Sequence, residues 1–199
     1  IRGAGNLLGA EQSGFITDMG FETYQKILAE AMEELGVETG IVTRSTNENY
    51  IVDCTIETDQ LALIPDAYID LTAEKIRIYK ELDSISNEKD LDVMRGKLTD
   101  RFGKIPLELE RLFDIVKIRQ LGVKLGFEKI IIKNGVLIAF FILNPLSQYY
   151  KSDKFSKVLE NISMHPQIFE IKQPDNRLRI VARNIDSISK AYSVLKKLQ

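Results

Sequence analysis

The chain has 199 residues, of which 44% are hydrophobic and 28% are charged, as in an ordinary globular protein. No apolar run reaches the roughly 18 residues that a membrane-spanning helix needs, and the first residues lack the pattern of a signal peptide. The single cysteine, Cys54, excludes an internal disulfide. We therefore expect a cytoplasmic protein rather than a membrane-spanning or disulfide-stabilised one.

The net charge of −2 conceals two segments of opposite sign. Residues 1–66 carry 3 basic and 12 acidic side chains, and residues 67–199 carry 24 basic and 17 acidic ones, so the net charges are −9 and +7. Such an asymmetry indicates segments with different surroundings. Three interpretations remain open: two solvated surfaces, two segments that dock on each other, or a basic part that meets an acidic partner or DNA.

The chain opens on IRGAGNLLGAEQSG, which contains four glycines. The spacing of Gly3, Gly5 and Gly9 is one residue too long for a dinucleotide-binding fingerprint, and no Lys-Ser or Lys-Thr follows as a P-loop requires. The pattern therefore disfavours a phosphate-binding loop. Because the chain begins on this motif without an initiator methionine, we expect it to be a piece of a longer protein.

Helical periodicity dominates the next part of the chain. Residues 20–36 predict an amphipathic helix that ends at a glycine, and residues 37–66 are interpreted as an extended connector about one strand long. Three further helices are expected between residues 68 and 126, the second of them capped by Ser86 or Asn87. The residues expected to face inward are Leu71, Ile78, Leu82 and Ile85, then Leu91, Met94, Leu98 and Phe102, then Leu109, Leu112, Phe113, Val116 and Leu121.

From residue 127 the period changes to that of strands. Two apolar runs are joined by Asn134-Gly135, a pair that favours the positive φ angles of a type I′ hairpin turn. A second hairpin is expected over residues 168–183, and helices are expected over residues 153–165 and 184–198, capped by Asp153 and by Asn184 or Asp186. The predicted class is α+β, with a helical N-terminal half followed by two hairpins whose four-stranded, mainly antiparallel sheet has helices on one face.

No self-sufficient active site is visible. The single histidine, His165, precedes a proline at an expected helix end, and Cys54 has no histidine near it in the sequence. No metal-binding or nucleophile motif occurs, so no catalytic, cofactor or metal residue is predicted. A basic run can contact phosphates or simply form a solvated surface. It consists of Lys117, Arg119, Lys124, Lys129 and Lys133.

The opening segment resembles the one that follows the last helicase motif in transcription-repair coupling factors and, more loosely, in RecG. The matching pattern is R-G-x-G-x-x-L-G-x-x-Q-S-G followed by G-F-x-x-Y. LIPDAYI, KIRIYKEL, LTDRFGKIP and KIRQLGVKLG resemble the C-terminal domain of the coupling factors, which RecG lacks. The resemblance extends from Arg2 to about Gly126.

The resemblance implies three parts: a helicase-motor tail over residues 1–36, a connector over 37–66 and a regulatory domain over 67–199. Arg2 and Gln12 would couple ATP hydrolysis to translocation, or Arg2 would only fix the loop. Tight backbone turns there would use Gly3, Gly5, Gly9 and Gly14. The parent would use ATP and Mg²⁺, move along duplex DNA, displace stalled RNA polymerase and recruit nucleotide-excision repair, whereas this fragment would hydrolyse nothing.

Residues 67–199 would act as an autoinhibitory domain by the same resemblance. They would fold back on the N-terminal repair-binding domain of the same protein and mask the surface that receives UvrA, without membrane contact. The alternative is a direct duplex-DNA-binding module that uses the basic C-terminal half. A steep fall of DNA affinity with salt would favour this alternative.

Overall fold

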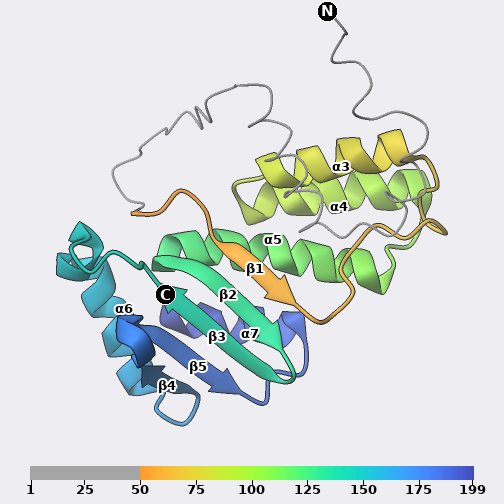
Figure 1. Cartoon of the computed structure of the whole chain (residues 1–199). Coiled ribbons are helices and arrows are strands. Elements are labelled where there is room, and N and C mark those ends of the chain that lie inside the picture. Colours follow the sequence, from red (N-terminus) through yellow and green to blue (C-terminus); the bar gives the residue numbers. More distant parts are fainter. Residues whose placement is uncertain (1–49) are drawn as a thin grey trace, which may run out of the picture. The chain divides into compact units, whose positions relative to one another are not determined.

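The computed structural model describes residues 50–199 (Figure 1). Arg2 and Gln12, which are predicted to couple ATP hydrolysis to translocation, the motif glycines and the helix expected over residues 20–36 lie outside the described residues. The described residues divide into two units, residues 62–112 and residues 50–61 with 113–199. The boundary between residues 112 and 113 falls within helix α5 (Leu107–Leu125), so this helix contributes residues to both units.

The first unit contains α3 (Thr72–Ser84), α4 (Glu88–Phe102) and the start of α5. The predicted cap of α4 is confirmed, because the Asn87 side chain accepts a hydrogen bond from the Asp90 amide at 3.0 Å. Most residues expected to face inward are buried here, namely Ile78, Leu82, Leu91, Met94, Leu98, Leu109 and Leu112. Leu71 is an exception at 67% exposure, because it precedes α3 as the N-cap residue and is not part of the helix.

The second unit is built on a five-stranded sheet in the order β1-β2-β3-β5-β4 (Figure 1). Its strands are β1 (Thr55–Thr58), β2 (Phe127–Lys133), β3 (Val136–Phe141), β4 (Phe169–Lys172) and β5 (Arg179–Arg183). The four predicted strands pair in antiparallel fashion, whereas β1 pairs in parallel with β2. The α+β class is confirmed, but the sheet gains a strand from the segment interpreted as a connector. The domain boundary expected between residues 66 and 67 would therefore leave β1 outside the domain that contains its partner strand β2.

Local turn and cap signals were partly correct. Asn134 and Gly135 have φ angles of 52° and 72°, as the predicted type I′ turn requires. The N-caps of α6 (Asp153–Met164) and α7 (Ile188–Leu195) are Ser152 and Ser187 rather than the predicted Asp153, Asn184 or Asp186. Each serine has an extended backbone and accepts a hydrogen bond from the amide three residues later, whereas Asp153 is already helical.

Helices cover one face of the sheet. This face carries Ile130, Ile132, Leu137, Ala139, Phe141, Ile180 and Ala182, all of them buried. Phe155 of α6 packs edge-on against Phe141, with ring centroids 5.6 Å apart, and Gly122 of α5 lies beside Ile130. Figure 1 shows α5 and α7 behind the sheet, so the prediction of helices on one face is confirmed for this unit. Within residues 50–199, no helix is long and apolar enough to cross a bilayer.

Candidate functional site at the acidic edge strand

The basic run predicted from sequence lies on two neighbouring elements of the second unit. Lys117, Arg119 and Lys124 are on α5, and Lys129 and Lys133 are on β2. The Lys117 ammonium lies 3.1 Å from the Asp114 carboxylate on the same helix and over the ring of Tyr192. Arg119, Lys129 and Lys133 contact carboxylates at or beside β1, so four of the five cations have an acidic partner within the chain.

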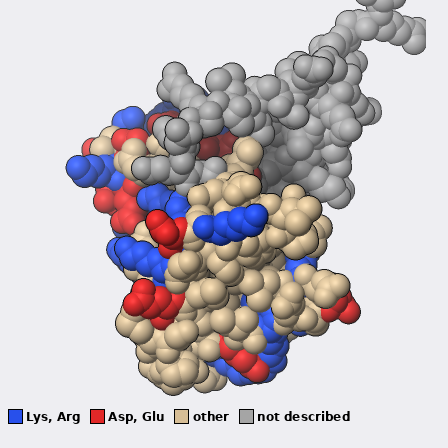
Figure 2. All heavy atoms as spheres, turned by 90° about the vertical axis from the view of Figure 1, so that its left-hand side faces the viewer, with Lys and Arg blue, Asp and Glu red and all other residues tan. Residues whose placement is uncertain are grey.

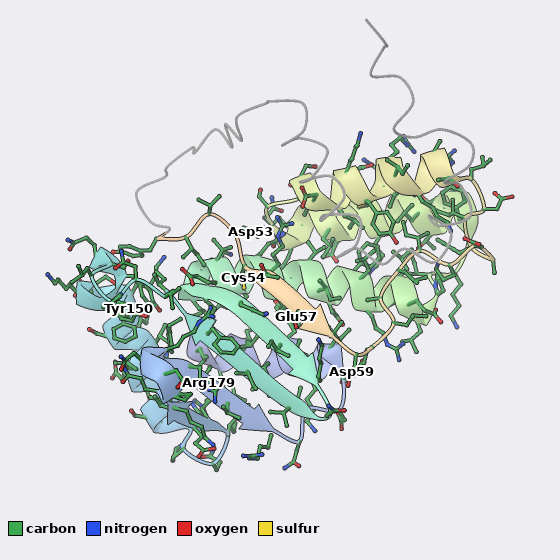
Figure 3. All side chains as sticks on the ribbon, viewed as in Figure 1. Asp53, Cys54, Glu57, Asp59, Tyr150 and Arg179 are labelled. Carbon is green, nitrogen blue, oxygen red and sulfur yellow. The ribbon has the colours of Figure 1, made fainter. Side chains whose placement is uncertain are left out.

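Asp53, two residues before β1, forms an ion pair with Arg119 of α5 (Figure 3). The Arg119 guanidinium donates two parallel hydrogen bonds to the Asp53 carboxylate, with distances of 2.6 Å from Nε and 3.0 Å from Nη2. Such a two-pronged pair fixes both position and orientation of the partners. Asp53 also accepts a hydrogen bond from the backbone amide of Cys54 at 2.7 Å. The carboxylate therefore sets the approach of the strand to the helix.

Glu57 holds the middle of β1 to β2. The Glu57 carboxylate lies 2.5 Å from Lys129 Nζ and 3.0 Å from Lys133 Nζ. Glu57 is in register with Ile131, so the two lysines lie two residues before and after its partner position, on the same face. Hydrogen bonds from both ammonium groups lower the pKa of Glu57 below its usual value.

Asp59 and Gln60 hold the chain just after β1. The Asp59 carboxylate accepts a hydrogen bond from the Asn134 amide in the β2–β3 turn at 2.7 Å. The Gln60 side chain donates to the backbone carbonyl of Asp186 at 3.0 Å. Polar contacts thus fix the segment before, within and after β1, as the labelled residues in Figure 3 show along the strand.

Cys54 is a packing residue in this structure. Its side chain is 1% exposed, and its Sγ atom lies only 2.5 Å from where a Cβ on Gly122 would stand. Burial, and next the negative charge of Asp53, raise the pKa of the thiol well above its usual range, which disfavours the reactive thiolate. Across residues 50–199, no group of three histidine, cysteine or carboxylate side chains is arranged to hold a metal ion.

The charge asymmetry of the sequence has a structural counterpart. Residues 50–66 contain four acidic and no basic side chains. Asp53 and Glu57 pair with cations of the second unit, and Asp66 pairs with the buried Lys75 of α3 in the first. Carboxylates of this stretch therefore contact cations of the basic segment, whereas the other eight acidic side chains of residues 1–66 lie outside the described residues. Figure 2, which faces α6 and β4, shows basic and acidic side chains interspersed over that side of the molecule.

The sequence reading missed the role of β1. Asp53, Glu57 and Asp59 fall at odd-numbered positions, the spacing of one strand face, and this was the available signal. Four strand residues are too few for a reliable alternation, and the partner strand begins three helices later. The segment consequently looked like a linker although it completes the sheet.

Comparisons with known proteins agree on one family. The model of the TRCF domain matches residues 58–152. The transcription-repair-coupling factor of Rickettsia typhi is 33% identical over 187 residues, which are 94% of this chain and 15% of that protein. The corresponding factor of Staphylococcus epidermidis is 41% identical over 145 residues, which are 73% of this chain and 12% of that protein. The chain thus spans a small part of the length of these curated relatives.

A solved structure shares the fold. It is described as the crystal structure of the C-terminal domain of a transcription-repair coupling factor, with a TM-score of 0.61 and 19% sequence identity. The match covers 73% of this chain and 89% of that one. The chain belongs to the transcription-repair coupling factor family, and it contains the fold of that family's C-terminal domain.

Proposed function

We propose that this chain is the C-terminal part of an ATP-dependent DNA translocase that displaces stalled RNA polymerase and recruits nucleotide-excision repair. Its domain after the motor tail is autoinhibitory and masks the UvrA-binding surface on the N-terminal repair-binding domain of the same protein. Family membership supports this proposal. ATP and Mg²⁺ would bind to the parent motor, upstream of this chain, and the fragment alone would not hydrolyse ATP.

The internal pairing of the basic run is the observation that favours regulation over DNA binding. A DNA-binding surface gains affinity by neutralising phosphates with free lysine and arginine side chains. Here Arg119, Lys129 and Lys133 already face Asp53 and Glu57 of the chain itself. Phosphate contacts would have to displace these carboxylates, which makes the direct duplex-DNA-binding module the weaker alternative.

Because the sheet includes β1, a truncation that tests the autoinhibitory role has to begin before this strand. Removing residues 67–199 from the full-length protein would leave β1 behind without its partner strand. Removing residues 50–199 takes the whole sheet and keeps the motor tail, so this truncation is the informative one. UvrA affinity and DNA-dependent ATPase activity are compared with those of the intact protein.

Release of autoinhibition predicts that both quantities rise in the truncated protein. Unchanged UvrA affinity would contradict the masking role. A truncation that leaves UvrA binding unchanged but weakens DNA binding, with a salt dependence that becomes shallower, would instead support the DNA-binding alternative. The two functions therefore predict different results when UvrA affinity, DNA affinity and ATPase activity are measured on the same truncated protein.

The coupling role of the motor tail needs a separate test. We propose that Arg2→Ala and Gln12→Ala in the full-length protein leave ATPase activity largely intact and abolish movement along DNA. Displacement of a stalled polymerase reports the movement, and ATP turnover reports the chemistry. Normal displacement by both variants would contradict the coupling role.

A further inference from the structure

The sheet of the second unit ends in β4, which pairs with β5 and has no strand on its other side among residues 50–199 (Figure 1). Edge strands present unpaired backbone groups, and proteins commonly protect them from pairing with prolines, bulges or lysines. β4 has the sequence Phe-Glu-Ile-Lys, which contains no proline and in which a glutamate accompanies the one lysine. Its outer side is therefore open to a further strand.

The backbone of β4 indicates which residue faces outward. The Phe169 amide donates a hydrogen bond to the His165 carbonyl at 3.1 Å, so this amide is turned away from β5. Backbone groups of successive residues in an antiparallel strand alternate between its two sides. The amide and carbonyl of Ile171, two residues later, consequently face outward as well. The described part of the chain offers them no hydrogen-bond partner on that side.

Ile171 is also the apolar residue that the edge leaves uncovered. Its side chain is 44% exposed, whereas that of Phe169, on the same face of β4, is 4% exposed. Their partners on β5, Ile180 and Ala182, are both fully buried. The apolar face of the sheet thus extends to Ile171 at the edge, where a neighbouring strand would cover it.

The sequence of β4 is complementary to a second copy of itself. In an antiparallel pair of two β4 strands centred on Ile171, Glu170 of each copy would lie opposite Lys172 of the other. Opposite charges at opposed positions stabilise a strand pair, and like charges destabilise it. Pairs centred on Glu170 or on Lys172 would oppose like charges. The charges therefore select the register centred on Ile171.

The outward backbone groups of Ile171 suit the same register. A residue that faces its own copy across a twofold axis exchanges two N–H···O hydrogen bonds with it when its amide and carbonyl point outward. Glu170 and Lys172 of the two copies then occupy the non-hydrogen-bonded positions, where Cα atoms are about 4.5 Å apart and side chains lie closest. Backbone direction and charge thus agree on one arrangement.

The existing ion pairs of β4 are compatible with this exchange. Within one chain, Glu170 lies 3.2 Å from Lys172 Nζ and 4.0 Å from Arg183 Nη2. All three side chains are more than one-third exposed, so water screens these pairs. On association, a Glu170–Lys172 contact within the strand is replaced by one between strands. The charges therefore set the register, and the backbone hydrogen bonds and the burial of Ile171 supply the affinity.

We propose that two copies of this chain associate through β4, paired in antiparallel fashion about a twofold axis at Ile171. A twofold contact uses the same surface of both copies, so association stops at the dimer. A four-residue strand buries less than the roughly 1,000 Å² of a stable interface, so the dimer is weak and concentration-dependent. This inference does not depend on the proposed function.

The test begins with sedimentation velocity of the complete 199-residue chain over a range of concentrations, where we expect monomer and dimer. Lys172→Glu opposes like charges twice across the twofold axis, so it should weaken dimerisation about tenfold. Lys80→Glu makes the same charge change at an exposed position of α3 in the first unit. This control should alter dimerisation less than about twofold.

Charge exchange separates pairing from any loss of folding. The double variant Glu170→Lys/Lys172→Glu restores both opposed pairs and should recover dimerisation to within about threefold of the unchanged chain. A mixture of the single variants Glu170→Lys and Lys172→Glu should form a heterodimer, because every opposed pair then carries opposite charges. Thermal melts of each variant show that the fold is intact.

Cysteine crosslinking measures the register. Ile171→Cys would face its own copy with Cα atoms about 5.5 Å apart, within the range of a disulfide. Lys172→Cys would be offset from its copy by two positions along the strand, about 8 Å, which is outside that range. The natural Cys54 is 1% exposed, so oxidation with copper phenanthroline reports the introduced residue. We expect Ile171→Cys to crosslink about tenfold faster than Lys172→Cys.

Four results would overturn the proposal. A chain that stays monomeric at millimolar concentration would lack the contact, and species larger than a dimer would show that pairing does not close. Equal effects of Lys172→Glu and Lys80→Glu would place the contact elsewhere. Equal crosslinking of Ile171→Cys and Lys172→Cys would exclude the proposed register. None of these measurements involves UvrA or DNA, so they fail or succeed independently of the proposed function.

Discussion

The two edges of the sheet are formed by strands of equal length that reach their places by different routes. β4 joins its neighbour β5 through the short turn Pro174–Asn176, whereas α3, α4 and α5 separate β1 from its neighbour β2. Closing a longer loop costs more conformational entropy, although the cost grows slowly with length. β1, which is far from its partner strand in the sequence, therefore needs stronger contacts in the folded state.

The contacts of the two edges differ accordingly. At the β1 edge, Cys54 and Ile56 are 1% and 5% exposed, and Asp53 and Glu57 pair with three cations. At the β4 edge, Phe169 is buried, but Ile171 is 44% exposed. Close packing and ion pairs hold the edge that is distant in sequence, whereas the local edge relies on its turn. The experiments below measure this difference.

The largest effect is expected where β1 packs on α5. Gly122→Ala would bring its Cβ within 2.5 Å of Cys54 Sγ and 3.2 Å of Ile130 Cδ1, and both of these neighbours are buried. We expect a loss of about 2 kcal/mol in the free energy of unfolding, even though alanine favours a helix over glycine. Urea denaturation measures it.

Gly96→Ala in α4 is the matched control, because nothing lies within 4 Å of its added Cβ. It should stabilise the protein by up to about 1 kcal/mol. In a Cys54→Ala background, where Sγ is absent, Gly122→Ala should cost clearly less than in the unchanged chain. Additive effects of the two substitutions would mean that the cost of Gly122→Ala does not arise from contact with Cys54 Sγ.

A smaller effect is expected from the charges of the same edge. Glu57→Gln removes the carboxylate that faces Lys129 and Lys133 and should cost about 1 kcal/mol at neutral pH, reduced by salt. Urea denaturation of both proteins at a series of pH values measures the difference.

The pH dependence has a definite sign. The folded-state pKa of Glu57 is lowered, so its contribution is complete above the unfolded pKa near 4.5 and is lost as the pH falls through the lower folded value. The stability difference between the two proteins should therefore vanish in acid. A difference that persists there would show that lost packing, rather than lost charge, accounts for the variant.

Features with local causes were predictable from the sequence. The Asn87 cap, the apolar stripes of α4 and α5 and the Asn134-Gly135 turn each depend on residues close together in the chain. The caps of α6 and α7 were displaced by one to three residues, because several candidate capping side chains adjoin each helix start. Which of them is extended depends on packing and not on residue type alone.

Features that depend on contacts between residues far apart in the sequence were not predictable in the same way. The parallel pairing of β1 with β2 and the ion pairs of Asp53 and Glu57 connect residues that are 66 or more positions apart in the sequence. The charge asymmetry indicated that the acidic and basic segments could dock on each other, but it did not identify the residues that pair. The register that brings residues of β2, β3 and β5 to one face of the sheet is not revealed by any single segment. Arg2 and Gln12 stay predictions, since they lie outside the described residues.

The smallest effect is expected at the β4 edge. Glu170 lies 3.2 Å from Lys172 Nζ and 4.0 Å from Arg183 Nη2, but its side chain is 55% exposed. Such pairs are screened by water, so Glu170→Gln should change the free energy of unfolding by less than about 0.5 kcal/mol. The same urea series used for Glu57→Gln measures it.

The ratio of the two glutamate effects is the sharpest form of the comparison. Each substitution removes one carboxylate from a four-residue edge strand. Each of these carboxylates faces two cations. They differ in exposure and in whether the strand is also held by a local turn. If Glu170→Gln cost as much as Glu57→Gln, the charges would act alike at both edges. The β1 edge would then differ from the β4 edge through the packing of Cys54 against Gly122 and through the Asp53–Arg119 pair, and not through Glu57.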